Sequence, residues 1–434
     1  MTTMRPIRSR KYLGAVTALA AAALLAAGCS SGSGGGSGAS GSGSPSTITL
    51  GVLAPLSGAN QNGGLAELHG AQIAVDQINA AGGIKALGGA KLKLVSADSS
   101  STSTSQAISA AQQLVADNPA AILGAVSSTL EIPASTVSEQ KKIPSCVGAL
   151  SDTLTSRGYK YLFQLPPTAT QLAKNAVPNF LTFLKAYYPN ITKVAVIYDS
   201  NPAETGTGQA FAKELSSMNT NVKVVLNKQY PLNFTDAAPL AAEIKSSGAE
   251  VIVPGSLASE LELIIGALNS AGVSGLPIFN AGGGDATGEL WVNELGKYAN
   301  GQYVLPNFAA QANLGNAKNQ LLAAANDAYV KDYKQPFMGQ YAGEYYVCTQ
   351  IIAQAIQNAK SADPTAIRDA IAGHTFATSA ASLYPPGQVH FGPTGLNTDG
   401  TSVIAQFCQG KLNVVGPPAM ATSKAQSTAA CGGV

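Results

Sequence analysis

The fold is decided by a strand–helix–strand unit in which TITLGVL (47–53) is followed by HGAQIAVDQINAAGGI (69–84) and then by KLKLVSA (91–97). The first and last stretches are short, apolar and β-branched or alternating, as is typical of strands. Between them a helix is expected over 64–81, with apolar residues at helical spacing: Leu65, Leu68, Ala71, Val75 and Ile78. The glycines at 82–83 supply the left-handed residue with which such a helix commonly ends. This unit predicts parallel strands joined by a crossover helix.

The same alternation continues in two series, separated by a break rich in Pro and Thr at 166–168. The further strands are expected at 120–125, 143–147, 193–198, 222–226, 251–253 and 277–280. The further helices are expected at 106–117, 208–218, 237–246, 260–271, 317–331, 339–359 and 364–372, before a strand-rich portion at 388–415. Two such series predict an α/β fold with two doubly wound lobes and parallel sheets, and the late helices look like the chain crossing back to complete the first lobe.

The N-terminus predicts an exported protein. A basic start precedes an apolar run from Leu13 to Ala27, which is shorter than the roughly 20 residues that a membrane span needs. LAAGC (25–29) resembles a bacterial lipobox, which implies a signal peptide over 1–28 and a lipid anchor on Cys29. The alternative is an ordinary signal with an incidental cysteine. Ser and Gly then dominate up to residue 46, as in a flexible tether.

The composition beyond the tether predicts a large folded module. About 388 residues follow, more than one core usually supports, and 45% of the chain is apolar. The net charge is only +2, no basic stripe suits nucleic acid, and no second apolar segment suits a membrane.

Four cysteines remain after Cys29, and an oxidising compartment permits disulfides among them. Cys146 lies in an apolar strand pattern and Cys348 in a helical one, so both could be buried small hydrophobic residues. We favour a Cys408–Cys431 disulfide, which would pin a polar C-terminal tail. No Cys/His spacing suggests a metal site.

Ligands of open α/β sheets bind beyond the carboxyl ends of the strands, so the loops after the predicted strands are candidates. GAVSST (124–129) ends a strand and opens a helix, whose N–H groups suit a carboxylate. Ser127 and Ser128 would add hydroxyl donors, although one of them could serve only as the N-cap. Ala149 and Ser151 follow the next strand and would lie beside this loop if the two strands are neighbours. The alternative is a polar loop that merely turns the chain.

Several stretches resemble the type I periplasmic binding proteins of the branched-chain amino acid (Leu/Ile/Val) family. They are LGVLAPLSG (50–58), HGAQIAVDQINAAGGI (69–84), GAVSST (124–129), IPSCVGALSD (143–152) with RGY (157–159), and FGPTG (391–395). The resemblance covers residues 48–415 and implies two lobes, three crossing segments and a ligand enclosed between the lobes. It also implies the substrate-binding lipoprotein of an ABC importer, which hands its solute to a permease.

The resemblance also implies roles for individual residues. Ser127 matches a serine that donates to the ligand carboxylate, while Ala149 and Ser151 match an Ala-x-Thr pair. Asn62 falls where an aromatic residue often covers the ligand. Thr205 falls where the second lobe usually supplies a tyrosine. Both replacements would make the pocket more polar.

One position departs from the family pattern. The second-lobe acid that pairs with the ligand ammonium should fall near Gly283, and Asp285 stands two residues later. Because an unpaired buried ammonium is costly, an amino-acid ligand requires a carboxylate nearby. Either Asp285 supplies it, or Asp285 only caps a helix and the ligand is an amide, a urea derivative or a carboxylic acid.

No enzyme motif is present, and no paired carboxylates stand out. We therefore expect no catalytic residues, no cofactor and no metal. The expected protein is a monomeric, extracytoplasmic solute-binding lipoprotein held at the membrane by its lipid, or else a ligand-sensing partner of a separate receptor. Its expected segments are the signal peptide 1–28, the anchor and tether 29–46, the first lobe 47–166 and 303–386, the second lobe 167–302 and 387–418, and a tail 419–434.

Overall fold

The computed structural model describes residues 45–58, 60–232, 234–282, 291 and 295–433. Its first sheet has five parallel strands in the order β2-β1-β3-β4-β5. The strands are β1 (Thr47–Ala54), β2 (Lys91–Asp98), β3 (Ala121–Leu123), β4 (Ser145–Val147) and β5 (Leu162–Gln164). The unit 47–98 confirms the strand–helix–strand prediction, because β1 and β2 pair in parallel over their whole length.

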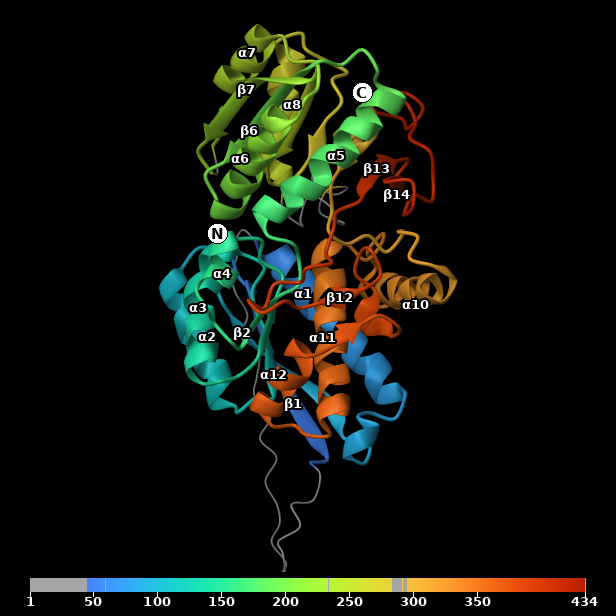
Figure 1. Ribbon diagram of the computed structural model, residues 1–434. Helices are drawn as coiled ribbons and strands as arrows, with labels where there is room; N and C mark the ends of the chain where they lie inside the picture. Colours follow the sequence, from blue (N-terminus) through green and yellow to red (C-terminus); the bar gives the residue numbers. More distant parts are fainter. Residues whose placement is uncertain (1–44, 59, 233, 283–290, 292–294, 434) are drawn as a thin grey trace, which may run out of the picture. The chain divides into compact units, whose positions relative to one another are not determined.

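Seven helices accompany this sheet among the described residues. They are α1 (Gln61–Ala80), α2 (Thr104–Ala116), α3 (Ser128–Gln140), α4 (Asp152–Ser156), α10 (Asn316–Tyr333), α11 (Gln340–Ala359) and α12 (Pro364–Ala372). The late helix α11 packs beside α1, as Figure 1 shows, so the chain does return to complete this half of the fold. Gly70 allows the close approach, because a Cβ at this position would overlap the carbonyl oxygen of Ala342.

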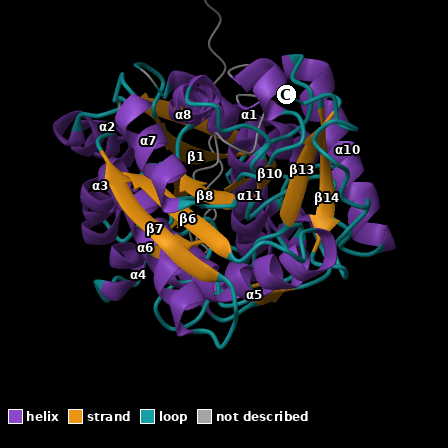
Figure 2. Cartoon of the chain, turned by 90° about the horizontal axis from the view of Figure 1, so that it is seen from above, coloured by secondary structure: helices purple, strands orange, loops and turns teal. Residues whose placement is uncertain are grey.

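A second group of strands begins after residue 187. Strands β6 (Lys193–Asp199), β7 (Lys223–Tyr230) and β8 (Val251–Gly255) form a parallel sheet in the order β7-β6-β8 (Figure 2). A bridge from Ile252 to Ile278 leads on to a four-stranded sheet in the order β14-β13-β10-β9. Its strands are β9 (Phe279–Asn280), β10 (Tyr303–Val304), β13 (Ile404–Cys408) and β14 (Lys411–Gly416).

The helices of this half are α5 (Ala169–Tyr187), α6 (Pro202–Ser217), α7 (Ala238–Ser247) and α8 (Ala258–Ser270). The short elements are β11 (Thr375–Phe376), β12 (Val389–His390), η1 (Lys85–Leu87), η3 (Gly296–Ala299) and η4 (Ala380–Ser382). The α/β class with parallel sheets is confirmed. The late strands differ from the all-parallel expectation, since β13 pairs antiparallel with both β10 and β14.

Three segments carry the chain between the two groups of strands, and hydrogen bonds tie them together. The N–H of Gln164 donates to the carbonyl of Gly395 at 2.8 Å, and the Asn397 side chain donates to the carbonyl of Leu165 at 3.0 Å. The N–H of Val403 donates to the carbonyl of Pro306 at 2.9 Å. The three crossing segments are therefore connected to one another by hydrogen bonds.

The described part of the chain contains two disulfides. Cys408–Cys431 confirms the favoured pairing. Cys146 and Cys348 are buried, as expected, but the interpretation that they are merely small hydrophobic residues is wrong, because they form a disulfide that joins β4 to α11. These two residues are 202 positions apart, and only the return of the chain to the first sheet brings them together. Among the described helices, none combines the length and the apolarity needed to cross a bilayer.

Candidate functional site

The two candidate loops of the first sheet lie side by side, because β3 and β4 are neighbouring parallel strands. The loop after β3 runs through Ser127 into α3, and the loop after β4 runs through Ala149 and Ser151 into α4. A direct hydrogen bond joins them, in which the N–H of Ser151 donates to the Oγ of Ser128 at 3.2 Å. Four of the predicted site residues are thus brought together at the carboxyl edge of this sheet.

The four residues play different structural parts. Ser127 is the N-cap residue of α3, with extended backbone and no capping bond from its side chain, so its hydroxyl is not used by the helix. The N–H groups of Ser128 and Thr129 have no carbonyl partner within the helix, as at any helix N-terminus, whereas that of Leu130 donates to the carbonyl of Ser127 at 3.0 Å. Ser128 is fully buried and serves the link between the loops. The first loop therefore offers one hydroxyl and a helix N-terminus.

The second loop is more fully engaged in its own structure. The Oγ of Ser151 caps α4 by accepting the N–H of Thr153 at 3.2 Å. Ala149 is fully buried, and its carbonyl accepts the side-chain amide of Gln164 at 2.9 Å. A serine hydroxyl that accepts one bond can still donate its own hydrogen, so the capping role and ligand binding are compatible at Ser151.

The remaining predicted residues lie on other elements. Asn62 is exposed in the first turn of α1. Thr205 lies in the first turn of α6, where its Oγ1 donates to the carbonyl of Asp199 at 2.9 Å and accepts the side chain of Gln229 at 2.7 Å. Asp285, Gly283 and the anchor Cys29 lie outside the described residues.

No paired carboxylates stand out in the sequence, but the fold brings several carboxyls together. Three glutamates, Glu67, Glu131 and Glu344, lie beneath the two first-sheet loops. At most 1% of the surface of each is exposed. Burial raises the pKa of all three: that of Glu131 to about 8, and those of Glu67 and Glu344 well above their ordinary value. The charges of Glu344 and Glu131 raise the pKa of Glu67 further. We call these three residues the first-sheet acid cluster.

A second group of acids lies at the carboxyl edge of the β7-β6-β8 sheet. Asp199 ends β6, while Glu204 and Glu260 lie in the first turns of α6 and α8. Burial raises the pKa of Asp199, and the charges of Glu204 and Glu260 raise it further. In the same place the hydroxyl of Tyr230 hydrogen bonds to Ser256 and to Glu260. Sequence reasoning missed both groups because each acid stands alone in the sequence.

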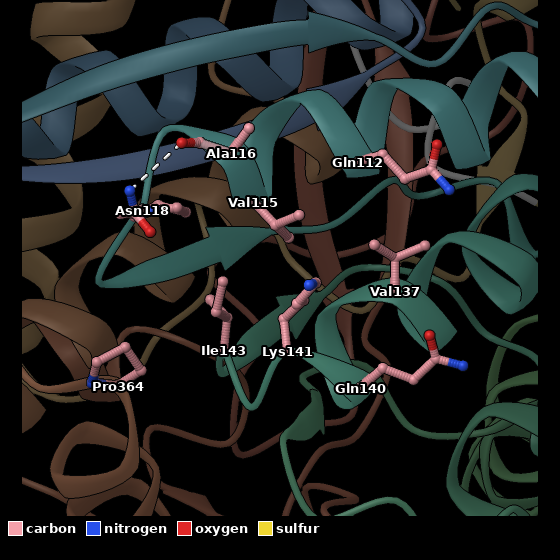
Figure 3. Close-up of a pocket in the computed structure, with 10 residues that line it drawn as sticks. Gln112, Val115, Ala116, Asn118, Val137, Gln140, Lys141, Ile143 and Pro364 are labelled. Carbon is pink, nitrogen blue, oxygen red and sulfur yellow. Dashed lines mark hydrogen bonds between the residues drawn. The ribbon is translucent and has the colours of Figure 1, made fainter.

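A separate hollow of about 770 Å³ lies at the other end of α3 (Figure 3). It is lined by Gln112, Val115, Ala116, Asn118, Pro119, Val137, Gln140, Lys141, Ile143 and Pro364. Because α3 begins beside Ser127 and ends at Gln140, this hollow is a helix length away from the paired loops. Its polar groups are amides and one lysine at the carboxyl ends of α2 and α3. We therefore place the candidate site at the paired loops. Among the described residues, no group of three His, Cys, Asp or Glu side chains could hold a metal ion.

Comparisons with known proteins agree with this fold. A family model described as "Periplasmic binding protein" matches residues 47–407. The Leu/Ile/Val-binding protein homolog 8 of Brucella abortus is 31% identical over 396 residues, which cover 87% of this chain and 92% of that protein. The homolog 7 of the same organism is 28% identical over 392 residues, with 87% and 93% coverage.

Solved structures with the same fold include two proteins named for branched-chain amino acid transport. The branched-chain amino acid transporter substrate-binding protein LivJ of Streptococcus pneumoniae, in complex with isoleucine, has a TM-score of 0.69 at 23% identity, covering 84% of this chain and 97% of that one. A putative branched-chain amino acid ABC transporter of Silicibacter pomeroyi has a TM-score of 0.71 at 18% identity. The match covers 88% of this chain and 99% of that one. At these identities the likeness shows the two-lobed fold.

Proposed function

Because this chain belongs to the periplasmic binding protein family, we propose that it captures a small polar solute, an amino acid in the first instance, and delivers it to the permease of an ABC transporter. The relatives named for binding Leu, Ile and Val support the amino-acid class, since they align with nearly nine-tenths of the chain.

The observation that carries this proposal is the pairing of the loops after β3 and β4. The hydroxyl of Ser127 makes no capping bond and stands at the N-terminus of α3, where a carboxylate is stabilised by N–H groups and by the helix dipole. The backbone of Ser151 is hydrogen bonded to Ser128, the residue after Ser127. We propose that these two hydroxyls and the start of α3 hold the carboxylate of the solute.

Capture would proceed by closure of the two lobes about the connected crossing segments. The open form would bind solute on the first-sheet loops, and contacts made only in the closed form would drive closure. The hydrogen bonds among the segments at 164–165, 306 and 395–403 support a hinge that moves as one unit. The closed form would then be presented to the permease.

Attachment to the membrane belongs to the same proposal. We infer that the mature chain is an extracytoplasmic monomer anchored by lipid on Cys29, with a tether to residue 46 that reaches about 20–25 Å. That reach would let the binding module turn while it stays near the permease. Metabolic labelling with palmitate tests the anchor: we expect label on the wild-type chain and none on Cys29→Ser.

The function is tested by calorimetric titration of the compact unit 44–434 with amino acids, amides, urea derivatives and small carboxylates. We expect at least one amino acid to bind with a micromolar dissociation constant or tighter. Binding restricted to solutes without an ammonium group would keep the capture function but remove the amino-acid class. A complete lack of binding by all four classes would contradict the proposal.

A further inference from the structure

Six buried oxygen atoms beneath the paired loops have no hydrogen-bond partner. They are both carboxyl oxygens of Glu67, both carboxyl oxygens of Glu344, and the hydroxyls of Tyr345 and Tyr384. All four side chains are fully buried. Tyr345 lies beside Glu67 and Tyr384 beside Glu344, but neither pair reaches hydrogen-bonding geometry. Because buried polar groups in folded proteins are nearly always paired, this concentration of unpaired oxygens points to a missing partner.

These oxygens lie against the backbone of the binding loop. A Cβ on Gly148 would stand 2.8 Å from Oε2 of Glu344 and 3.1 Å from the ring of Tyr345. Gly148 directly precedes Ala149, so the Glu344 carboxyl occupies the space that any larger residue at the start of this loop would fill. The glycine thus lets an acid approach the site at which we place the solute.

The third acid of the cluster is already satisfied and serves as a contrast. Oε2 of Glu131 accepts the N–H of Ala125 at 2.7 Å, and the nearby charge of Arg157 favours its ionised form. Glu131 therefore has a structural role at the first loop. No basic group acts on Glu67 or Glu344. The nearest polar groups are Tyr345 and the Val126 backbone at Glu67, and Gln340 and Tyr384 at Glu344, but none of them reaches hydrogen-bonding geometry with either carboxyl.

The donor that fits Glu344 and Glu67 carries several N–H groups and a positive charge. Water would supply hydrogen bonds but no charge, and no described group of acids has the arrangement for a metal ion. An ammonium group supplies three donors and neutralises one carboxylate, while like-charge repulsion keeps the second carboxyl protonated. A solute held by its carboxylate at Ser127 and Ser151 would bring such a group close to Gly148.

We propose that Glu344, assisted by Glu67, recognises the cationic nitrogen of the solute, so that cation recognition in this chain resides in the first lobe. This inference rests on the proposed function. It differs from the pattern implied by the family resemblance, which places the acid of the second lobe near position 283, where this chain has glycine. Because burial raises the pKa of Glu344, pairing of its carboxylate with a cation should be accompanied by proton release. The groups that face Glu344 are Glu67, Gln340, Tyr345 and Tyr384, and Glu131 acts on Glu67 and Tyr345 from α3.

The test compares each of two amino acids with its deaminated counterpart. The two pairs are L-leucine with 4-methylpentanoate and L-valine with 3-methylbutanoate. Each compound is titrated into the detergent-solubilised full chain, once in phosphate buffer and once in Tris buffer. Comparing the two buffers gives proton release together with affinity. The variants are Glu344→Gln and Glu67→Gln, which keep the side-chain shape without the charge. Glu139→Gln is the matched control: Glu139 lies at the far end of α3, where it accepts the N–H groups of Lys160 and Tyr161.

We expect the wild type and Glu139→Gln to prefer each amino acid by about 100-fold or more and to release a proton on binding it, as the loss of a buried charge partner implies. In Glu344→Gln the preference should fall below about 10-fold, with no proton release, and in Glu67→Gln it should fall by a smaller factor. A folded Glu344→Gln with the wild-type preference would overturn the inference and leave the function intact. The inference would also be overturned if the wild type bound each amino acid and its deaminated counterpart with equal affinity. A wild type that binds none of the four solutes would overturn the inference for these two amino acids. The proposed function would fall as well only if amino acids, amides, urea derivatives and small carboxylates all fail to bind.

Discussion

The Oγ of Ser128 accepts the backbone N–H of Ser151 at 3.2 Å, and this bond joins the loops that follow β3 and β4. Ser128 is completely buried, so its hydroxyl supports the site instead of facing the solute. Removing it should leave the Ser151 N–H without its partner. We expect Ser128→Ala to lower the free energy of unfolding by about 1–3 kcal/mol and to weaken solute binding as the loops separate. Urea unfolding and calorimetry measure the two effects, and an unchanged midpoint with unchanged affinity would contradict the supporting role.

Ser127 and Ser151 should separate binding from stability. Both hydroxyls are assigned to the solute carboxylate, so each change to alanine should weaken binding by about 1–3 kcal/mol. Only Ser151 also caps a helix, so Ser151→Ala should lower stability by about 1 kcal/mol while Ser127→Ala leaves it unchanged. Calorimetry and urea unfolding of both variants check this. Wild-type affinity in both would remove the site assignment.

The packing of α1 against α11 depends on Gly70. A methyl group at this position would overlap the carbonyl oxygen of Ala342. Because the atoms it would meet are backbone atoms of α11, they cannot move aside as a flexible side chain could. We expect Gly70→Ala to lower the free energy of unfolding by about 2–3 kcal/mol. Gly266→Ala in α8 is the matched control, because nothing lies within 4 Å of its added Cβ. It should raise stability by about 0.5–1 kcal/mol. Equal effects in both variants would contradict the close contact.

The disulfide between Cys146 and Cys348 holds the loop-bearing strand β4 to α11. Replacing both residues by alanine should lower the free energy of unfolding by about 2–5 kcal/mol. The Cys408–Cys431 bond closes a much shorter loop, with a separation of 23, so its removal should cost less. Urea unfolding of the two double variants tests the order. A larger loss of unfolding free energy on removal of the Cys408–Cys431 disulfide would contradict this prediction.

The first-sheet acid cluster should make stability fall as pH rises. Burial raises the pKa of Glu131 from 4.5 to about 8, so the folded chain binds this proton more tightly than the unfolded chain. The stability linked to this proton is present below about pH 4.5 and is lost as the pH rises towards 8. In Glu131→Gln this loss should disappear. The measurement is the difference in unfolding free energy between the two proteins at pH 5 and pH 8, and the same difference at both values would contradict the assignment.

The sequence predicted the elements whose signals are local. The helix α12 was expected at its observed bounds, Pro364–Ala372, because Asp363 caps it and a proline opens it. In contrast, α5 was not predicted, because Pro178 lies inside it and reads as a helix breaker. The helix α6 begins six residues before its expected start, since Asn201 caps it and its early glycines masked the pattern.

At the candidate site, the sequence predicted the loops but not the groups beneath them. The strand-to-helix signals at 124–129 and 148–152 are continuous in the chain, and the neighbouring strands bring them together. Glu67, Glu131 and Glu344 lie far apart in the sequence. Each is in a helix, where the local pattern predicts a single exposed acid. Their burial arises only when α1, α3 and α11 pack around the carboxyl ends of the strands. For the same reason, no local pattern signals the Cys146–Cys348 bond.

The central claim is tested most directly by a crystal structure of the chain grown with the amino acid that binds it. We expect the carboxylate of that amino acid within about 2.7–3.2 Å of the Ser127 hydroxyl and of N–H groups at the start of α3. The Ser151 hydroxyl should contact the same carboxylate. An amino acid found elsewhere, such as in the hollow beside Gln140 and Ile143, with the paired loops empty of it, would contradict the account.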